Sequence, residues 1–220
     1  MRPAPAPPYP SRLIGRHWLS PETFELRLER PDGFSFRAGQ RVQIVDEAAE
    51  RDYSLVCGPR SAELAVCIRR IPGGLLSSRL AEMPIGNRLR IAGPYGYFCY
   101  EPADDPVIFV ATGTGIAPFR SMAADSVTGF TLLHGVRDPE ECYYASELRK
   151  TAYRYIPCIS GGSAAGQGGF AGRVTDYSRL HLSSGRYEFY LSGRREMIRD
   201  MTALIDERFP DSRVYTEIFF

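Results

Sequence analysis

Several features that mark particular protein classes are scarce or missing in this sequence of 220 residues. No stretch of about 18 apolar residues is present, which excludes a transmembrane helix. The proline-rich start lacks the apolar core of a signal peptide. The 27 basic residues are nearly balanced by 26 acidic ones, so no basic excess points to nucleic acid. We therefore expect a globular protein of the cytoplasm that neither inserts into a membrane nor binds nucleic acid.

Cysteine and histidine are too few and too scattered for a metal site. The five cysteines form no CxxC pair, and the three histidines are isolated. Iron–sulfur ligands usually come partly in tight groups, and zinc sites need clustered Cys or His. We expect reduced thiols, no metal and no attached iron–sulfur domain. Lys150 is the single lysine, so arginine is the general basic residue here and a lone arginine is weak evidence for a site.

The two halves of the chain differ in their hydrophobic pattern. After a proline-rich, mobile lead-in over residues 1–10, apolar and polar residues alternate in short runs near residues 24–28, 42–44, 64–68 and 89–91. Such runs, separated by turns, indicate an antiparallel barrel or sandwich. From residue 104 onward, apolar runs recur at intervals that suit strands alternating with helices in a parallel sheet; they begin near Val107, Thr131, Tyr155, Glu188 and Val214. We place the domains at residues 11–103 and 104–220.

Local signals predict several helices and loops. A short helix is expected over residues 77–83, with a serine as N-cap. Asp138, Pro139 and the two glutamates after them predict a helix start. A surface helix is indicated by the apolar spacing of Met197, Met201, Leu204 and Ile205. Residues 160–172 are rich in glycine and predict a loop.

One glycine motif points to phosphate binding. Thr112-Gly113-Thr114-Gly115-Ile116-Ala117-Pro118 follows an apolar strand and precedes a predicted helix. Glycines there let the backbone approach a phosphate, and a helix N-terminus offers free N–H groups. A tight turn without any ligand explains the motif about equally well, because short glycine patterns have many false positives.

Three further segments are weak alone. Arg51-Asp52-Tyr53-Ser54 offers an anion-binding guanidinium and a flat ring, but an ordinary strand edge is the simpler interpretation. Gly74-Leu75-Leu76-Ser77 is a plain turn by itself, and Ser192-Gly193-Arg194-Arg195-Glu196-Met197 follows another apolar run. Ligands of open α/β sheets bind outside the carboxyl ends of strands, so residues 112–115, 135–137 and 192–194 should line one crevice. The alternative is three unrelated loops.

Taken together and in this order, these segments resemble the RxYS, GxxS, nicotinamide-nucleotide and CGxxxM signatures of the ferredoxin–NADP reductase family. The acidic-aromatic end, Glu217-Ile218-Phe219-Phe220, resembles that of short bacterial ferredoxin and flavodoxin reductases. The resemblance covers about residues 11–220. It implies a two-domain β plus α/β protein, in which a six-stranded antiparallel FAD-binding barrel precedes a parallel-sheet nicotinamide-nucleotide domain.

The resemblance also implies roles for individual residues. Arg51 and Ser77 hold the FAD pyrophosphate, Tyr53 packs on the flavin and Ser54 lies near its N5 atom. The residues expected to bind FAD are Arg51, Asp52, Tyr53, Ser54, Gly74, Leu76, Ser77, Phe219 and Phe220. Those expected to bind NAD(P)H are Thr112, Gly113, Thr114, Gly115, Arg137, Arg173, Gly193, Arg194 and Met197. Those expected to be catalytic are Ser54, Ser192, Glu217 and Phe219.

Three positions carry further expectations. Ser192 stands where the family often has cysteine, which keeps a small polar group beside the nicotinamide. A 2′-phosphate needs cations such as Arg137 and Arg173, but Gly161 stands where related NADPH enzymes often have arginine, so we expect weak discrimination that favours NADH. Phe219 is expected to cover the flavin at rest and to move for hydride transfer. The alternative is a closing strand whose aromatic rings fill the core.

The resemblance implies a FAD-dependent oxidoreductase that transfers electrons between NAD(P)H and a separate ferredoxin, flavodoxin or oxygenase iron–sulfur component. We expect the enzyme to be a monomer. Three alternatives stay open: an NAD(P)H:flavin oxidoreductase that releases its flavin, an electron-transfer subunit of a larger complex, and a non-catalytic nucleotide sensor. The sequence identifies neither the electron acceptor nor the direction of electron flow.

Overall fold

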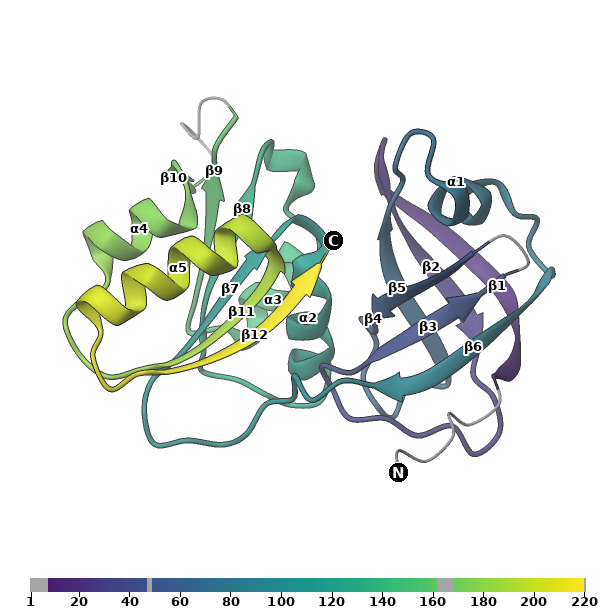
Figure 1. The fold of residues 1–220 in the computed structure, drawn as a ribbon, viewed down its shortest axis with the longest axis horizontal. Helices are drawn as coiled ribbons and strands as arrows, with labels where there is room; N and C mark the ends of the chain where they lie inside the picture. The colour runs from purple at the N-terminus through teal and green to yellow at the C-terminus, as the bar shows by residue number, and fades with distance from the viewer. Residues whose placement is uncertain (1–7, 47–48, 162–167, 220) are drawn as a thin grey trace.

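The structure is a computed structural model that describes residues 8–46, 49–161 and 168–219. Two six-stranded sheets form two halves that lie side by side (Figure 1). The first sheet has the order β4-β3-β6-β1-β2-β5, and all of its pairings are antiparallel. Its strands are β1 (Tyr9–Ser20), β2 (Thr23–Glu29), β3 (Arg41–Val45), β4 (Glu50–Ser54), β5 (Glu63–Arg69) and β6 (Arg88–Tyr95).

Period-two alternation builds the core of this first domain. In β2, Phe24, Leu26 and Leu28 are fully buried on one face. An isolated bridge between Leu55 and Val66 brings the chain after β4 against β5 and closes the sheet into a barrel. The predicted antiparallel six-stranded domain is therefore confirmed.

The barrel differs from the sequence prediction at its helix. Helix α1 (Leu75–Glu82) begins two residues earlier than expected, and its N-cap is Gly74, which has no side chain to cap with. Ser77 instead lies in the first turn, where its Oγ accepts the N–H of Ile71 at 3.1 Å. The predicted serine cap was wrong because the loop before the helix uses that hydroxyl. The strand at Tyr9 and Pro10 also shows that the lead-in ends before residue 10.

The second sheet has the order β10-β9-β8-β7-β11-β12, with parallel pairings throughout. Five of its six strands begin within one residue of the predicted positions, and the central strands are buried on both faces as a covered parallel sheet requires. The strands are β7 (Val107–Thr112), β8 (Thr131–Val136), β9 (Arg154–Ile159), β10 (Phe170–Ala171), β11 (Glu188–Arg194) and β12 (Arg213–Phe219). Its helices are α2 (Ala117–Ala124), α3 (Ala145–Thr151), α4 (Val174–His181) and α5 (Arg195–Arg208), with η1 (Gly113–Ile116) before α2.

The predicted helix start at Asp138 is wrong. Only a 3-10 turn, η2 (Pro139–Glu141), forms there, and α3 begins at Ala145. The carboxylate of Glu141 accepts the backbone N–H of Arg137 at 2.9 Å. Tyr144 then takes a positive φ of 59°, which interrupts the helical path. Of the predicted glycine-rich loop, residues 162–167 lie outside the described part of the chain.

Other expectations can be compared with the described residues. Helix α5 buries the predicted apolar stripe, with Met201, Leu204 and Ile205 at its centre. The five cysteines are free thiols. No helix in the described part of the chain has the length and apolar character that a membrane crossing requires.

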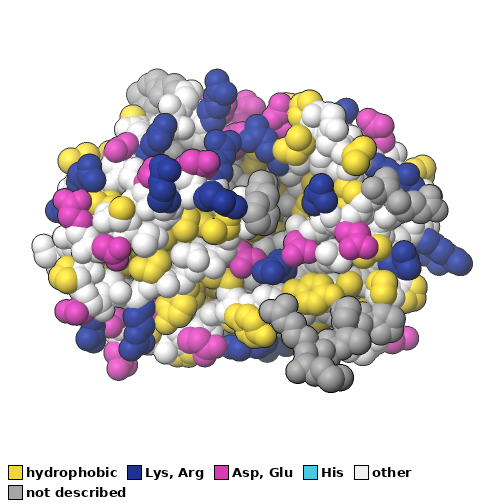
Figure 2. All heavy atoms as spheres, viewed as in Figure 1, with side chains coloured by type: hydrophobic (Ala, Val, Ile, Leu, Met, Phe, Trp, Pro, Cys, Tyr) yellow, Lys and Arg dark blue, Asp and Glu magenta, His cyan; other side chains and the backbone are white. Residues whose placement is uncertain are grey.

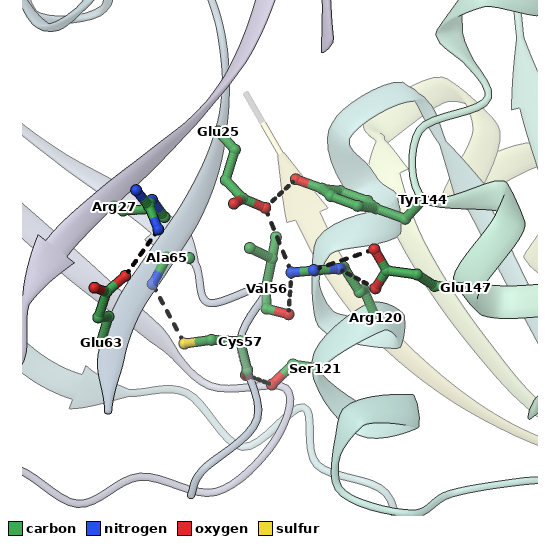
Figure 3. Close-up of polar contacts among 10 residues, drawn as sticks. All are labelled: Glu25, Arg27, Val56, Cys57, Glu63, Ala65, Arg120, Ser121, Tyr144 and Glu147. Atoms are coloured by element: carbon green, nitrogen blue, oxygen red, sulfur yellow. Dashed lines mark hydrogen bonds and ion pairs between the residues drawn. The ribbon is translucent and has the colours of Figure 1, made fainter. Parts of the chain in front are cut away.

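Arg120 on α2 connects the two domains (Figure 3). Its Nη1 donates to the carbonyl of Val56 at 3.1 Å and lies 3.4 Å from Glu25 Oε2 on β2. Its Nε lies 3.1 Å from Glu147 on α3. The guanidinium stacks 4.4 Å from the ring centre of Tyr144, whose hydroxyl donates to Glu25 at 3.0 Å. One cation therefore binds barrel and α/β domain together.

Beside Arg120, uncharged hydrogen bonds cross the same boundary. The Ser121 hydroxyl donates to the carbonyl of Cys57 at 2.6 Å (Figure 3). The Tyr143 hydroxyl donates to Thr23 Oγ1 at 2.9 Å. Because Ser121 is fully buried, this boundary is packed rather than solvated, which fixes the angle between the domains.

Replacing Arg120 should destabilise the protein strongly. Arg120→Met keeps much of the volume but leaves the largely buried carboxylate of Glu25 without its cation. Because the pair is not fully buried, we expect a loss of about 3 kcal/mol, the lower end of the range for breaking a buried ion pair. Denaturant unfolding should measure this loss. The matched control is Arg27→Met, since Arg27 lies on the same strand as Glu25 and pairs with Glu63 of β5, but both side chains of that pair are nearly half exposed; it should cost less than about 1 kcal/mol. Equal losses in the two variants would contradict the assigned role of Arg120.

Candidate active site

The carboxyl ends of β7 and β11 meet in a close backbone contact. A Cβ atom at Gly115 would lie 2.4 Å from the carbonyl oxygen of Ser192, and one at Gly193 would lie 2.2 Å from Thr112 Oγ1. Thr112 Oγ1 accepts the backbone N–H of Arg194 at 2.9 Å. Both glycines are thus required by close approach, and Gly193 also has a φ of +133°. The loops that follow these two strands are therefore in direct contact with each other.

The buried side chain of His134 on β8 contacts the glycine-containing loop that follows β7. Its Nε2 lies 3.1 Å from the carbonyl oxygen of Gly113, and its Nδ1 lies 2.9 Å from the hydroxyl of Tyr155. A carbonyl only accepts, so Nε2 carries the proton and Nδ1 accepts from Tyr155. Complete burial lowers the pKa of His134 to about 4. The imidazole is therefore neutral near pH 7 and holds the loop as a hydrogen-bond donor.

Strand β4 supplies the barrel side of the site. Arg51 is exposed, and its Nη1 donates to the carbonyl of Glu50 at 2.7 Å. Tyr53 is half-buried, and burial raises its pKa to about 12, so its phenol is neutral. Ser54 is buried at the end of the strand. An ion pair of 2.6 Å between Arg79 of α1 and Asp46 ties the helix to the β3–β4 connection.

Strand β12 carries the C-terminal residues to the domain boundary. Tyr215, Glu217 and Phe219 share one face and are half-buried, while Ile218 faces solvent. The side chain of Glu217 is only 14% exposed, and its Oε1 lies 2.9 Å from Arg41 Nη1 of the barrel. The ring of Tyr215 stacks on Tyr190 at 4.4 Å. Half-burial of the face with Glu217 fits a cleft better than a closed core.

Register places both domains' polar residues next to one another. Ser54 lies opposite Arg41 in the β3–β4 pairing, and Ser192 lies opposite Glu217 in the β11–β12 pairing. Since Arg41 and Glu217 are in contact, these four residues form one continuous set across the boundary. Sequence reasoning identified three of them but missed Arg41, for which no local motif exists.

The remaining predicted residues differ in exposure. Arg137, Arg173 and Arg194 are exposed, and Figure 2 shows basic side chains over the edge of the α/β domain where the parallel strands end. Leu76 and Met197, in contrast, have side chains buried in the two hydrophobic cores. Only their backbone can face a ligand. Phe220 lies outside the described residues.

These residues fit a flavin and a dinucleotide. The hydroxyls of Ser54 and Ser192 are buried, yet neither has a hydrogen-bond partner among the described residues. A buried polar group without a partner is costly, so each hydroxyl is suited to a ligand. The exposed Arg51 and the first turn of α1, next to Gly74, are suited to an anion such as a pyrophosphate.

The two halves of the chain match two family models. Residues 11–100 match the oxidoreductase FAD-binding domain, and residues 109–203 match the oxidoreductase NAD-binding domain. Together these models cover most of the chain. The expected FAD and nicotinamide-nucleotide domains, and with them the oxidoreductase class, are confirmed.

Named relatives point the same way. The chain is 37% identical over 160 residues to ferredoxin–NADP reductase B of Sorangium cellulosum, a match that covers 67% of this chain and 66% of the relative. It is 31% identical over 191 residues to reductase component 1 of terephthalate 1,2-dioxygenase from Comamonas sp., covering 80% of this chain and 57% of the relative. The chain thus spans about two thirds or less of these relatives.

Solved structures share the fold. The cytochrome P450 reductase GcoB of Amycolatopsis superposes with a TM-score of 0.85 at 26% identity, covering 97% of this chain and 70% of that one. A ferredoxin NADP+ reductase from Neisseria gonorrhoeae with bound FAD and NADP also gives 0.85, at 21% identity, over 98% and 100% of the two chains.

The buried neutral His134 should make stability depend on pH. Its pKa is about 4 when folded and 6.5 when exposed, so the unfolded state binds more protons between these values. The free energy of unfolding should therefore fall as pH drops from 6.5 toward 4, by about 2 kcal/mol at pH 5 relative to pH 7.5. Urea unfolding at a series of pH values measures this. His134→Asn should flatten the curve, while the exposed His17→Gln should keep the wild-type slope; identical curves for wild type and His134→Asn would refute the assignment.

Proposed function

The chain belongs to the ferredoxin–NAD(P)H reductase family, and from this premise we propose that it transfers electrons from NAD(P)H, through bound FAD, to a separate one-electron carrier. The observation that carries the proposal is the set of Ser54, Arg41, Glu217 and Ser192, which is continuous across the domain boundary. Hydride transfer requires both cofactors to meet at one place, and this is where the FAD-binding and NAD-binding halves share residues.

Each half has its own binding task. Arg51 and the first turn of α1 hold the pyrophosphate of FAD, Tyr53 packs on the flavin ring, and the free hydroxyl of Ser54 donates to it. FAD, when bound, accepts a hydride and releases electrons singly. The loop that follows β7 holds the nucleotide phosphates against the N-terminus of η1 and α2.

The nicotinamide side is shaped by β11 and β12. The buried hydroxyl of Ser192 orients the nicotinamide where other members of the family use cysteine. Glu217 faces the same place from the neighbouring strand, where its carboxylate binds the nicotinamide or relays a proton. Phe219, at the end of β12, covers the flavin until the nicotinamide displaces it.

The relatives support the choice of carrier class. One is named as a ferredoxin–NADP reductase and another as the reductase component of a dioxygenase. In this proposal the chain reduces a ferredoxin, a flavodoxin or the iron–sulfur component of an oxygenase, and it acts as a monomer in the cytoplasm.

The first test combines cofactor analysis with rapid kinetics. The purified protein should be yellow, and heat should release FAD rather than FMN. Anaerobic stopped-flow mixing with NADH or NADPH should bleach the flavin, and ferredoxin or flavodoxin should reoxidise it. Failure of both nucleotides to reduce the flavin would refute the proposal. A flavin that is lost on purification but reduced as a free substrate would favour the flavin oxidoreductase alternative.

The same experiment tests nucleotide choice. The Cβ of any larger residue at Gly161 would lie 2.5 Å from Arg137 Cγ, so the two positions cannot both carry long side chains without rearrangement. Arg137 and Arg173 are then the exposed cations that we assign to a 2′-phosphate, and we expect a weak preference for NADH. A preference for NADPH above about 100-fold, which corresponds to about 2.7 kcal/mol, would contradict this assignment.

Phe219→Ser should tighten nicotinamide binding. If the ring competes with nicotinamide for the flavin face, its removal should lower the Kd for NAD+ and NADP+ by about 2- to 10-fold, the range of an aromatic stack. Difference spectra of the oxidised flavin measure both Kd values. Ile218→Ser, on the exposed opposite face of β12, is the matched control and should leave them unchanged. An unchanged flavin spectrum and unchanged affinities in Phe219→Ser would favour the core-packing alternative.

A further inference from the structure

Arg41 binds two carboxylates, one in each domain. Its Nε lies 2.9 Å from Asp52 Oδ2 on the neighbouring barrel strand, and its Nη1 lies 2.9 Å from Glu217 Oε1 on β12. Gln43 also donates to Asp52, at 3.3 Å. The guanidinium is therefore anchored on the barrel by Asp52 and directs its other end at the α/β domain.

Strand β12 needs an attachment of this kind. It is the last strand of its sheet, so among the described residues it pairs only with β11, and its outer edge has no strand beside it. Its final residues, Glu217 and Phe219, are those that the proposed function places beside flavin and nicotinamide. The contact with Arg41 fixes this end of the strand to the opposite domain.

The ion pair also forms part of the wall of a groove between the domains. The groove has a volume of about 690 Å³. Its walls combine aromatic rings with polar groups, and Tyr97 on its rim is fully exposed. The residues beside the ion pair are Gln40, Tyr95, Tyr97, Phe98 and Tyr215. Open space on this side means that Glu217 is not held by packing alone, because the groove leaves room for its side chain to move.

We propose that Arg41 is a positioning residue, which holds the carboxylate of Glu217 and the end of β12 in one place across the domain boundary. This inference rests on the proposed function and assigns to it a residue that none of the sequence signatures contains. Without Arg41, the Glu217 carboxylate would stay largely buried without a cation, so the strand end would move toward solvent or Glu217 would take up a proton.

The charges around Glu217 give the direction of its titration. Burial raises its pKa, Arg41 lowers it, and Asp52 raises it. Cys99 also interacts electrostatically with Glu217. Loss of the Arg41 cation should therefore raise the pKa of Glu217, so that steps needing its carboxylate fail at a higher pH than in the wild type.

Hydrogen exchange tests the positioning directly and does not depend on catalysis. Amides of β12 should exchange about 5- to 10-fold faster in Arg41→Gln than in the wild type, while Arg41→Lys, which keeps the charge, should restore most of the protection. Arg37→Gln is the matched control, since Arg37 forms an exposed ion pair with Glu101; its β12 exchange should equal that of the wild type. Unchanged exchange in Arg41→Gln would overturn the proposal.

The pH dependence of flavin reduction separates positioning from simple stabilisation. In Arg41→Gln the acidic limb of the reduction rate should move to higher pH, and Arg41→Lys should move it back. In Glu217→Gln the limb should be absent, and adding Arg41→Gln should cause no further shift. An acidic limb that stays in place in Arg41→Gln would overturn the positioning role. If the wild type is not reduced by either nucleotide, the proposed function fails, while the exchange experiment still decides whether Arg41 holds β12.

Discussion

The guanidinium of Arg120 sets the relation between the two domains, and the cleft depends on that relation. It reaches from α2 to Glu25 and Val56 of the barrel half and to Glu147 of α3. Its side chain is 21% exposed and that of Glu25 15%, so desolvation must be offset by several partners at once. The Arg41–Glu217 pair works in the opposite direction, from the barrel to β12. Two arginines thus hold the domains, each anchored in a different one.

Parts of the fold could be predicted because burial leaves a local pattern of apolar residues. Strand β7 is continuously apolar since it lies in the middle of a covered sheet. Strand β1 was missed, and strand β4 gave only a weak local indication of a strand edge. Strand β4 reads Glu-Arg-Asp-Tyr-Ser and lies at a sheet edge, so its residues are mostly exposed. Strand β1 is long, pairs with both β2 and β6, and changes register twice along β2, which blurs a period of two. The helix start at Asp138 failed because tertiary contacts of Tyr144 outweighed a good local cap.

The site residues show the same contrast between positions with a local sequence signal and positions without one. Gly115 and Gly193 could be predicted because close backbone approach demands glycine at positions fixed by the strand ends. Arg41 and Arg120 could not be, because their partners are far along the chain; Arg41 and Glu217 are 176 residues apart. In a sequence with one lysine, an arginine that joins two domains looks the same as one that merely faces solvent. Met197 is a different case, since it belongs to a signature although its side chain lies in the core.

The protein alone is left with polar groups that it does not satisfy. Ser54 and Ser192 each bury a hydroxyl without a partner among the described residues, at a cost of about 1–3 kcal/mol per group. Alanine at either position would remove that cost, because it fits the same space and has no donor to satisfy. Elsewhere at the boundary, buried hydroxyls such as those of Ser121 and Tyr143 do have partners, so the fold is able to provide them. The unsatisfied pair lies where the FAD-binding and NAD-binding halves share residues, and a ligand with an acceptor at each hydroxyl would recover the energy on binding. The apo protein should therefore gain stability from flavin and nucleotide at the residues that weaken it.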